Sequence, residues 1–386
     1  MKPPVSKLPD VGTTIFTVIS RRADELGAVN LGQGFPDYPV DPRLIELVTA
    51  AMQAGFNQYA PMAGVPALQQ RIAEDVQRRH GRSIDVAAEI TIAVGATEAI
   101  FSAILALVGQ GDEVIVFDPA YDSYDPAVRL AGARCVHVPL QPPHFGFDWD
   151  RVRAAVTPRT RMLIVNSPQN PSCTVLSRED MQQLARLAEE HDLLVLSDEV
   201  YEHLVYDGAV HRSVLTEPAL AGRSLAVFSF GKSLHATGLR VGYCIAPAPL
   251  TTELRRVHQF NTFTIATALQ HAIAAYLAEK PGVFDGLATF FTAKRRRLTE
   301  GLAGSVLKVL PSAGTYFTLV DYSASELLGA LDDGEAARVL LEKVGVASIP
   351  LTPFYREPVR HRLLRLCFAK QDATLTRAAE RLCTLR

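Results

Sequence analysis

Short apolar runs alternate with helical patterns along most of the chain, from about residue 41 to residue 281. The runs are rich in Val and Ile and lie at 89–94, 113–117, 162–165, 193–196, 226–230 and 241–246. Several end in Gly, Pro, Ser or Asp, as strands buried on both faces of a sheet commonly do. Between them, apolar residues recur at helical spacing, and Ser177 with Asp180 has the pattern of a capping box. The alternation predicts an α/β protein whose mostly parallel sheet lies between two layers of helices.

The pattern changes beyond about residue 281. A long helix is expected around the basic run 294–297, and strand-like segments follow at 314–320, 346–350 and 363–368. An extended arm with Pro3, Pro4 and Pro9 opens the chain. We therefore expect an N-terminal arm at 1–40 that is part of the small domain, a large domain at 41–281, and a small α+β domain completed by 282–386.

Composition narrows the classes of function. Among the 386 residues, 48% are hydrophobic and 21% are charged, so a large core can form. The 39 Lys and Arg residues nearly balance the 41 Asp and Glu residues, which gives no electrostatic signature of nucleic-acid or anionic-lipid binding. The run 294–297 is more typical of a solvated helix face. No nucleic-acid or membrane partner is expected.

The cysteines and the N-terminus indicate a cytoplasmic protein. Five scattered cysteines without a C-x-x-C pattern favour a reducing compartment and argue against a disulfide framework or a zinc cluster. We expect no metal site. The first residues lack the apolar segment of a secretory signal, and the longest apolar stretch is too short to cross a bilayer.

Three motifs follow predicted strands, at the sheet edge where α/β proteins place their ligands. The first is Gly95-Ala96-Thr97, which opens a predicted helix whose free N–H groups and dipole would favour a phosphate. Taken alone, the motif is more typical of an ordinary strand-to-helix turn. The second is Asp198 with Tyr201, which could present a carboxylate and a phenol to one ligand, unless Asp198 caps a helix.

The third motif is Lys232, with Ser229 three residues before it and Arg240 eight residues after it. A P-loop is excluded because Ala226 occupies the position of its first glycine. A surface lysine is the usual alternative, but the apolar strand that leads to Lys232 argues against it. Lysine amines condense with carbonyl groups, carboxylates pair with pyridinium nitrogens, and arginine binds phosphate as a planar fork. Together the three motifs predict a site for pyridoxal 5'-phosphate (PLP).

Over essentially its whole length the chain resembles the fold-type I, class I aminotransferases. The motifs that carry the resemblance are NQYAP at 57–61, GATEA at 95–99, DPAYDSY at 118–124, NP at 170–171, SDEVY at 197–201, SFGK at 229–232 and RLCF at 365–368. QGFPD at 33–37, QPPHF at 141–145 and YDSY at 121–124 resemble the methionine and kynurenine aminotransferase branch.

The resemblance implies a role for each site residue. Lys232, Asp198 and Tyr201 would be catalytic: Lys232 holds PLP and moves the proton, and Asp198 pairs with the ring nitrogen. Tyr201 and Asn170 would bond the ring's phenolic oxygen. The remaining cofactor contacts would be Tyr121, stacked on the ring, and the phosphate ligands Ala96, Thr97, Ser229 and Arg240, with Tyr59 from the second subunit of a homodimer.

The resemblance also implies the substrate contacts and the reaction. Arg365 would bind the substrate carboxylate, Gly34 would close over it, and Asn170, Phe16 and Phe263 would complete the pocket. The expected reaction is ping-pong transfer of an amino group from methionine or an aromatic or large neutral amino acid to a 2-oxo acid. Elimination from cysteine conjugates, as in a β-lyase, is the alternative on the same site. A PLP-binding sensor without catalysis is a further alternative, but no basic DNA-binding segment precedes residue 30.

Overall fold

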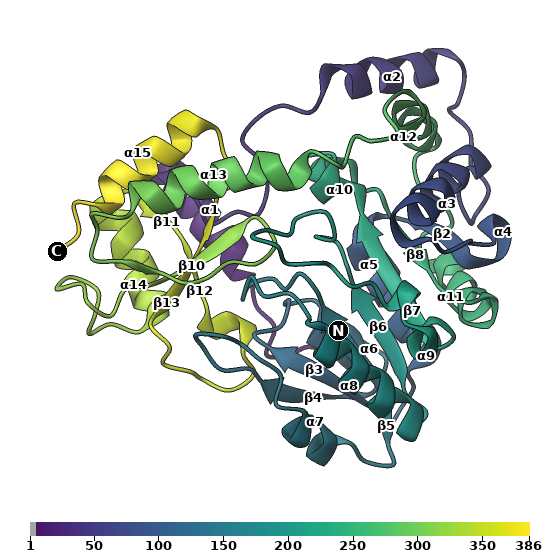
Figure 1. Ribbon diagram of the computed structural model, residues 1–386, viewed down its shortest axis with the longest axis horizontal. Coiled ribbons are helices and arrows are strands. Elements are labelled where there is room, and N and C mark those ends of the chain that lie inside the picture. Colours follow the sequence, from purple (N-terminus) through teal and green to yellow (C-terminus); the bar gives the residue numbers. More distant parts are fainter. Residues whose placement is uncertain (1–4) are drawn as a thin grey trace.

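The computed structural model describes residues 5–386, so the predicted opening of the arm at Pro3 and Pro4 lies outside the described residues. A seven-stranded sheet forms the centre of the larger part of the molecule (Figure 1). In spatial order its strands are β2 (Ile90–Ala93), β8 (Gly242–Ile245), β7 (Ser224–Ser229), β6 (Leu194–Asp198), β5 (Thr160–Asn166), β3 (Glu113–Asp118) and β4 (Arg134–Pro139). Neighbours from β7 to β4 pair in parallel, whereas β8 is antiparallel to β2 and β7. The predicted mostly parallel sheet is confirmed.

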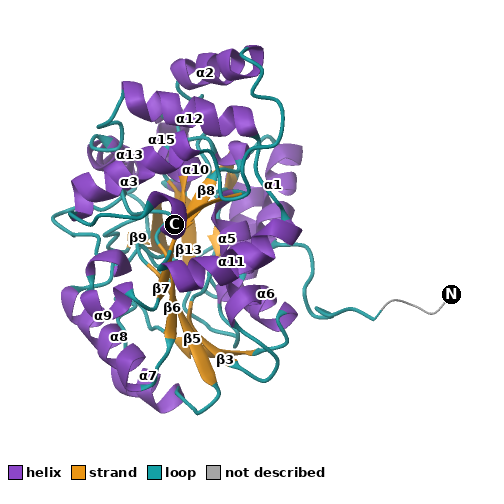
Figure 2. Cartoon of the chain, turned by 90° about the vertical axis from the view of Figure 1, so that its right-hand side faces the viewer, coloured by secondary structure: helices purple, strands orange, loops and turns teal. Residues whose placement is uncertain are grey.

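Both faces of this sheet are buried. On β3, Val114 and Val116 pack into one hydrophobic cluster, while Ile115 and Phe117 pack into a second one. Successive side chains of a strand point to opposite faces, so burial of both faces requires the continuous apolar run seen in the sequence. Figure 2 shows the sheet between two layers of helices, with α7, α8 and α9 on one side and α5, α6 and α11 on the other.

The helices of this larger part follow the predicted alternation between β2 and β8, whereas α2, α3 and α4 precede the sheet and α11 and α12 follow it. They are α2 (Pro42–Gln53), α3 (Pro66–His80), α4 (Val86–Glu89), α5 (Gly95–Leu107), α6 (Tyr124–Leu130), α7 (Trp149–Ala155), α8 (Arg178–Glu190), α9 (Pro218–Ala221), α10 (Phe230–Ser233), α11 (Ala248–Asn261) and α12 (Thr267–Glu279). The capping box is present at the start of α8: Ser177 Oγ accepts the Asp180 N–H, and the Asp180 carboxylate accepts the Ser177 N–H, each at 3.0 Å. Such a cap satisfies two otherwise unpaired donors.

A second, smaller sheet lies beside the first (Figure 1). Its strands are β12 (Ile349–Pro350), β13 (Leu363–Cys367), β10 (Phe317–Asp321) and β9 (Lys308–Val309), accompanied by α13 (Leu287–Gly301), α14 (Asp333–Val339) and α15 (Asp372–Leu382). Near the N-terminus, α1 (Ile15–Leu26) leads to β1 (Val29–Asn30), which pairs in parallel with β11 (Val346–Ala347). The N-terminal segment thus joins the C-terminal region, and the predicted two-part α/β fold is confirmed. The boundaries at residues 40 and 281 stay predictions.

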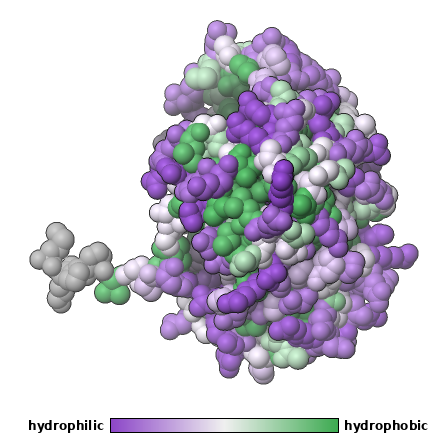
Figure 3. Space-filling model, turned by 90° about the vertical axis from the view of Figure 1, so that its left-hand side faces the viewer, coloured by the Kyte–Doolittle hydropathy of each residue, from purple (hydrophilic) through white to green (hydrophobic). Residues whose placement is uncertain are grey.

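The basic run 294–297 lies within α13, as predicted. Lys294 pairs with Asp372 at 2.8 Å and Arg295 pairs with Asp207 at 2.7 Å, while the other two arginines are exposed. Figure 3 shows the end of the molecule that carries the smaller sheet, where hydrophilic residues surround a smaller hydrophobic area. Within residues 5–386, every helix is too short or too polar to cross a membrane.

Candidate active site

The start of α5 and the side chain of Arg240 form a site for an anion. As predicted, Gly95-Ala96-Thr97 opens α5 directly after β2. Gly95 has φ +67°, and a Cβ added there would lie 2.8 Å from Nη2 of Arg240, so the guanidinium packs against bare backbone. A Cβ at Gly242 would lie 2.8 Å from the Ala96 nitrogen, so its absence allows β8 to approach the same turn. A helix N-terminus and an arginine thus converge, an arrangement that favours phosphate.

Lys232 lies in the short helix α10, just after Ser229 at the end of β7. Its Nζ is 3.5 Å from the carbonyl oxygen of Gly34 and 5.7 Å from the centres of the Tyr201 and Tyr316 rings. Burial disfavours the charged ammonium and lowers the pKa of Lys232 to about 8. The alternative of a solvated surface lysine is therefore wrong, and an uncharged amine is accessible near neutral pH.

Asp198 ends β6 and is buried. Burial raises the pKa of its carboxyl to about 6, although the hydroxyl of Tyr124, which donates to Oδ2 at 2.7 Å, opposes this effect. Oδ1 accepts the Val200 N–H at 3.3 Å within a turn, and no helix begins there, so the helix-cap alternative is wrong. A cationic ligand atom beside this carboxylate would favour its charged form.

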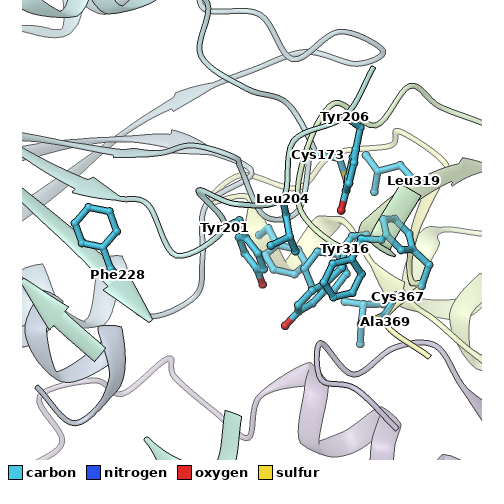
Figure 4. Packing of buried hydrophobic residues seen from close by; sticks show 14 of the residues in the cluster. Cys173, Tyr201, Leu204, Tyr206, Phe228, Tyr316, Leu319, Cys367 and Ala369 are labelled. Carbon is cyan, nitrogen blue, oxygen red and sulfur yellow. The ribbon is translucent and has the colours of Figure 1, made fainter. Parts of the chain in front are cut away.

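Tyr201 and Tyr316 pack edge to face, with ring centres 5.1 Å apart. Figure 4 shows both hydroxyls pointing out of the surrounding hydrophobic core in the same direction. The Tyr316 hydroxyl donates to the Gly34 carbonyl oxygen at 2.5 Å, which fixes the glycine-rich loop above Lys232. Tyr201 thus offers a buried phenol on the same side as the lysine amine.

One cavity collects most of the predicted cofactor residues. It is lined by Ala96, Thr97, Tyr121, Asn170, Asp198, Tyr201, Ser229, Lys232 and Arg240, together with Ile100, Asn166 and Val200. It combines an anion site, an amine of lowered pKa and a buried carboxylate. These are the groups that a phosphorylated pyridine aldehyde requires for its phosphate, its carbonyl carbon and its ring nitrogen. The donor set therefore fits PLP.

Arg365 is buried on β13 and is 1% exposed. Its Nη1 donates to Oδ1 of Asn170 at 2.6 Å and its Nη2 donates to the Gly32 carbonyl oxygen at 2.9 Å. The guanidinium carbon lies 3.9 Å from the centre of the Phe317 ring and 5.1 Å from that of Phe16. Within residues 5–386 it forms no ion pair with an acidic side chain, and its Nε has no hydrogen-bond partner. A buried, unpaired arginine is suited to receive a substrate carboxylate.

Tyr59 and Phe263 lie outside both this cavity and the Arg365 environment of their own chain. Tyr59 is 85% exposed, Phe263 is 40% exposed, and their ring centres are 5.4 Å apart on the surface. Phe263 was expected to line the substrate pocket. In a single chain it does not, and it could reach such a pocket only in a neighbouring copy.

Sequence reasoning assigned no role to three further residues of the site. Tyr124 donates to Asp198, and Tyr316 holds Gly34. Asn166 accepts the Asn170 N–H at 2.8 Å and donates to the Asp198 carbonyl oxygen at 2.9 Å. Asn166 could have been found from the sequence, because it directly follows the predicted strand 162–165 at the same sheet edge as Asp198.

This fold, with Lys232 and Asp198 lining one cavity and the buried Arg365 bonded to Asn170 of the same lining, defines a PLP-dependent enzyme of amino-acid metabolism. The pattern of the family described as aminotransferase class I and II matches residues 27–382, and the chain belongs to that family. Members of this family use PLP, which is therefore the cofactor of this aminotransferase.

Individual relatives cover nearly the whole chain. A methionine aminotransferase of Escherichia coli is 48% identical over 98% of this chain and 97% of its own length, and a crystal structure of that protein superposes with a TM-score of 0.97 over 99% of this chain and 100% of its own. The structure of N-succinyldiaminopimelate aminotransferase from Mycobacterium tuberculosis has a TM-score of 0.94 and 40% identity, over 99% of this chain and 100% of its own. Human kynurenine–oxoglutarate transaminase 1 is 33% identical over 93% of each chain.

Proposed function

We propose that this aminotransferase moves the amino group of methionine, or of an aromatic or large neutral amino acid, to a 2-oxo acid by ping-pong chemistry. The observation that carries the proposal is the position of Lys232, which is partly buried in one cavity with the anion site and Asp198, while the unpaired Arg365 bonds Asn170 of the same cavity. Two aromatic rings, Phe16 and Phe354, lie 5.1 and 5.6 Å from the Arg365 guanidinium and favour an apolar substrate side chain. The similarity to a methionine aminotransferase supports the same substrate class.

The cofactor contacts follow from the cavity. Ala96, Thr97, Ser229 and Arg240 would hold the phosphate, and Tyr121 would cover one face of the ring. Asp198 would keep the ring nitrogen protonated, since a carboxylate favours a neighbouring cation. Asn170 and Tyr201 would donate hydrogen bonds to the ring oxygen. PLP, when bound, supplies an electron sink for the bond broken at the substrate's Cα.

The remaining groups orient the substrate and move its proton. Arg365 would bind the α-carboxylate with two N–H groups, which fixes the direction of the Cα–H bond. The Lys232 amine has a pKa near neutrality and would accept that proton and later return it. The Gly34 carbonyl oxygen lies within 3.5 Å of Nζ and would help to position the amine.

Elimination from cysteine conjugates remains the alternative outcome on the same site. The relatives named above are all described as aminotransferases or transaminases, and no contact in residues 5–386 specifically favours elimination. We therefore keep amino transfer as the proposed reaction.

A panel of amino acids tests the proposal. Purified enzyme loaded with PLP is mixed with methionine, phenylalanine, glutamine or aspartate, and the 2-oxo acid product is measured. Methionine and phenylalanine should be converted far faster than aspartate, and Lys232→Ala should lose at least about a thousandfold in rate. Lys343→Ala, at an exposed helical position, is the matched control and should retain full activity. Faster turnover of aspartate, or activity in Lys232→Ala, would contradict the proposal.

We further propose a homodimer in which each site takes residues from both chains. Aromatic side chains are exposed together near the ends of α2 and α11: Tyr59 at 85%, Phe260 at 86% and Phe263 at 40%. Phe56 is 40% exposed and stacks on His271 at 3.7 Å. An exposed aromatic group of this kind is typical of an interface between subunits. Tyr59 of the second chain would contact the phosphate, and Phe263 of the second chain would contact the substrate.

Subunit mixing tests the shared site. Lys232→Ala and Tyr59→Ala chains are each purified, unfolded together and refolded. One site of each mixed dimer would combine an intact Lys232 with an intact Tyr59, so the mixture should recover about a quarter of wild-type activity. If the refolded mixture is no more active than the average of the two parents, the two residues belong to one chain's site.

We also propose a cytoplasmic location. All five cysteines are free thiols, and three of them are buried. Free thiols persist in reducing compartments.

A further inference from the structure

A second cavity, of about 380 Å³, opens beside Tyr121 on the side of the N-terminal arm. Tyr121 lines both cavities, so the second one adjoins the proposed cofactor site. Phe16 and Phe354 form its inner wall, next to Arg365. The rest of its lining includes six titratable residues, Asp10, Asp122, Asp125, Arg129, His137 and Arg356, which we call the charged wall. A substrate whose α-carboxylate binds Arg365 would extend its side chain along this cavity.

Asp10 of the arm binds two arginines of the charged wall. Arg129 donates two hydrogen bonds to its carboxylate, one of them at 3.1 Å, and Nη1 of Arg356 lies 3.5 Å from Oδ2. Within residues 5–386, Asp10 is the sole acidic partner of Arg356, whereas Arg129 also pairs with Asp125 at 3.1 Å. The Asp10 side chain is half exposed. A carboxylate on a surface segment therefore pairs with two arginines that line the cavity, of which Arg356 is itself half exposed.

The other acids of this wall are engaged elsewhere or buried. His137 lies between Asp118 at 2.8 Å and Asp125 at 3.4 Å. Burial lowers the pKa of His137, but the hydrogen bonds that its ring donates to the two carboxylates outweigh this effect and raise the pKa to about 11. Burial raises the pKa of Asp122. Asp10 is therefore the anion that can leave with the least loss of buried interactions.

A ping-pong aminotransferase must bind two different substrates in one pocket. An apolar donor side chain fits between the Phe16 and Phe354 rings, but an acceptor with a second carboxylate would need a cationic partner at the far end. We propose that Arg129 and Arg356 form a subsite for the distal carboxylate of a dicarboxylic 2-oxo acid, and that Asp10 occupies this subsite until such a substrate replaces it. The inference rests on the proposed function and adds the class of the acceptor.

The exchange is electrostatically feasible because one carboxylate replaces another. The number of charges in the wall stays the same, and Arg356 keeps an anionic partner. Half-exposed ion pairs contribute little to the stability of a protein, so release of Asp10 from the two arginines costs little free energy. With an apolar side chain in the cavity, Asp10 stays in place and neither arginine is left unpaired.

Equilibrium binding of two inert acids tests the subsite without turnover. Glutarate carries two carboxylates, and pentanoate is a monocarboxylate of equal length. Their dissociation constants for the PLP-loaded enzyme are measured by titration calorimetry, in the wild type and in Asp10→Asn, Arg129→Gln and Arg356→Gln. Asp192→Asn and Arg256→Gln change exposed residues of similar ion pairs elsewhere and serve as matched controls.

The dissociation constant of pentanoate divided by that of glutarate measures how much the second carboxylate strengthens binding, and therefore how well the subsite binds it. Asp10→Asn should raise this ratio roughly two- to fivefold, and each arginine variant should lower it roughly threefold or more, while the controls keep the wild-type value. An unchanged ratio in all three variants would overturn the subsite, and a lower ratio in Asp10→Asn would overturn the masking role of Asp10. Failure of methionine turnover would instead contradict the proposed function, so the two results are distinguishable.

Discussion

Replacement of Tyr124 by Phe removes the hydroxyl that donates to the buried carboxylate of Asp198 at 2.7 Å. Burial raises the pKa of Asp198 from 3.8 to about 6, and the Tyr124 hydrogen bond opposes this rise. In the cofactor-free enzyme the hydroxyl therefore faces a mostly neutral carboxyl at pH 5 and a carboxylate at pH 8. The stabilisation that it provides should differ between these two pH values.

The direction follows from the raised pKa. Because the folded state holds the Asp198 proton more tightly than the unfolded state does, this proton stabilises the fold fully below about pH 4, and its contribution is lost as the pH rises through about 6. Hydrogen bonds between neutral groups contribute about 0.5–1.5 kcal/mol, whereas those to charged groups contribute about 1.5–3 kcal/mol. Tyr124→Phe should therefore destabilise the cofactor-free enzyme by about 1 kcal/mol more at pH 8 than at pH 5.

Urea unfolding of the cofactor-free enzyme at both pH values measures this difference. Tyr206→Phe is the matched control, since Tyr206 is also buried but donates to a backbone carbonyl oxygen, that of Thr315, at 2.5 Å. Its loss should cost the same free energy of unfolding at pH 5 and at pH 8. Equal destabilisation by Tyr124→Phe at the two pH values would refute the reasoning, because Tyr124 would then not favour the ionised form of Asp198.

Three further predictions concern the anion site, the lysine and the arginine. Gly95→Ala should weaken PLP binding at least about tenfold, because the added Cβ would lie 2.8 Å from Nη2 of Arg240. Gly81→Ala is the control: Gly81 has the same φ of +67° but open space around it, so this change should lower only the stability of the fold. Equal PLP dissociation constants in the two variants would contradict the prediction. The rate at which the cofactor-free enzyme binds PLP should rise with pH to a plateau, with a midpoint near the lowered Lys232 pKa of about 8 and not near the ordinary lysine pKa of 10.5. A rate that stays constant from pH 7 to 9 would contradict the lowered pKa. Arg365→Gln should raise the KM for methionine roughly a hundredfold. Arg365→Lys should raise it less, because lysine keeps the charge but not the planar pair of donors. Unchanged KM values in steady-state kinetics would show that Arg365 does not bind the substrate carboxylate.

The central strands were predictable because burial on both faces leaves a continuous apolar run. The runs at 113–117 and 162–165 correspond to β3 and β5. Strand β4 was missed, because it lies at the edge of the sheet and most of its residues, such as Cys135 and His137, are only half buried. One-sided burial of an edge strand produces no such run, and β9, with two residues, is too short for any pattern.

Within the site, too, some residues could be predicted from the sequence and others could not. Motifs at strand ends indicated Lys232, Asp198 and Gly95, because parallel strands bring their carboxyl ends to one edge of a sheet. Tyr124 gave no such signal, since its contact with Asp198 spans 74 positions of the chain. The link of Arg365 to Asn170 spans 195 positions and depends on how the smaller sheet meets the larger one.

The sequence by itself determined the alternating α/β pattern and the order of the chemical groups, because periodicity and strand-end motifs are local properties of the chain. The tertiary structure alone decided the electrostatics: it shielded Lys232 and Asp198 from most of the solvent, which moved both pKa values toward neutrality, and it left Arg365 without an acidic partner among the described residues. It also placed Asp10 of the arm between Arg129 and Arg356, a contact across 119 and 346 positions that no local pattern encodes. Desolvation and long-range ion pairing depend on everything packed around a group, so only the folded chain determines them.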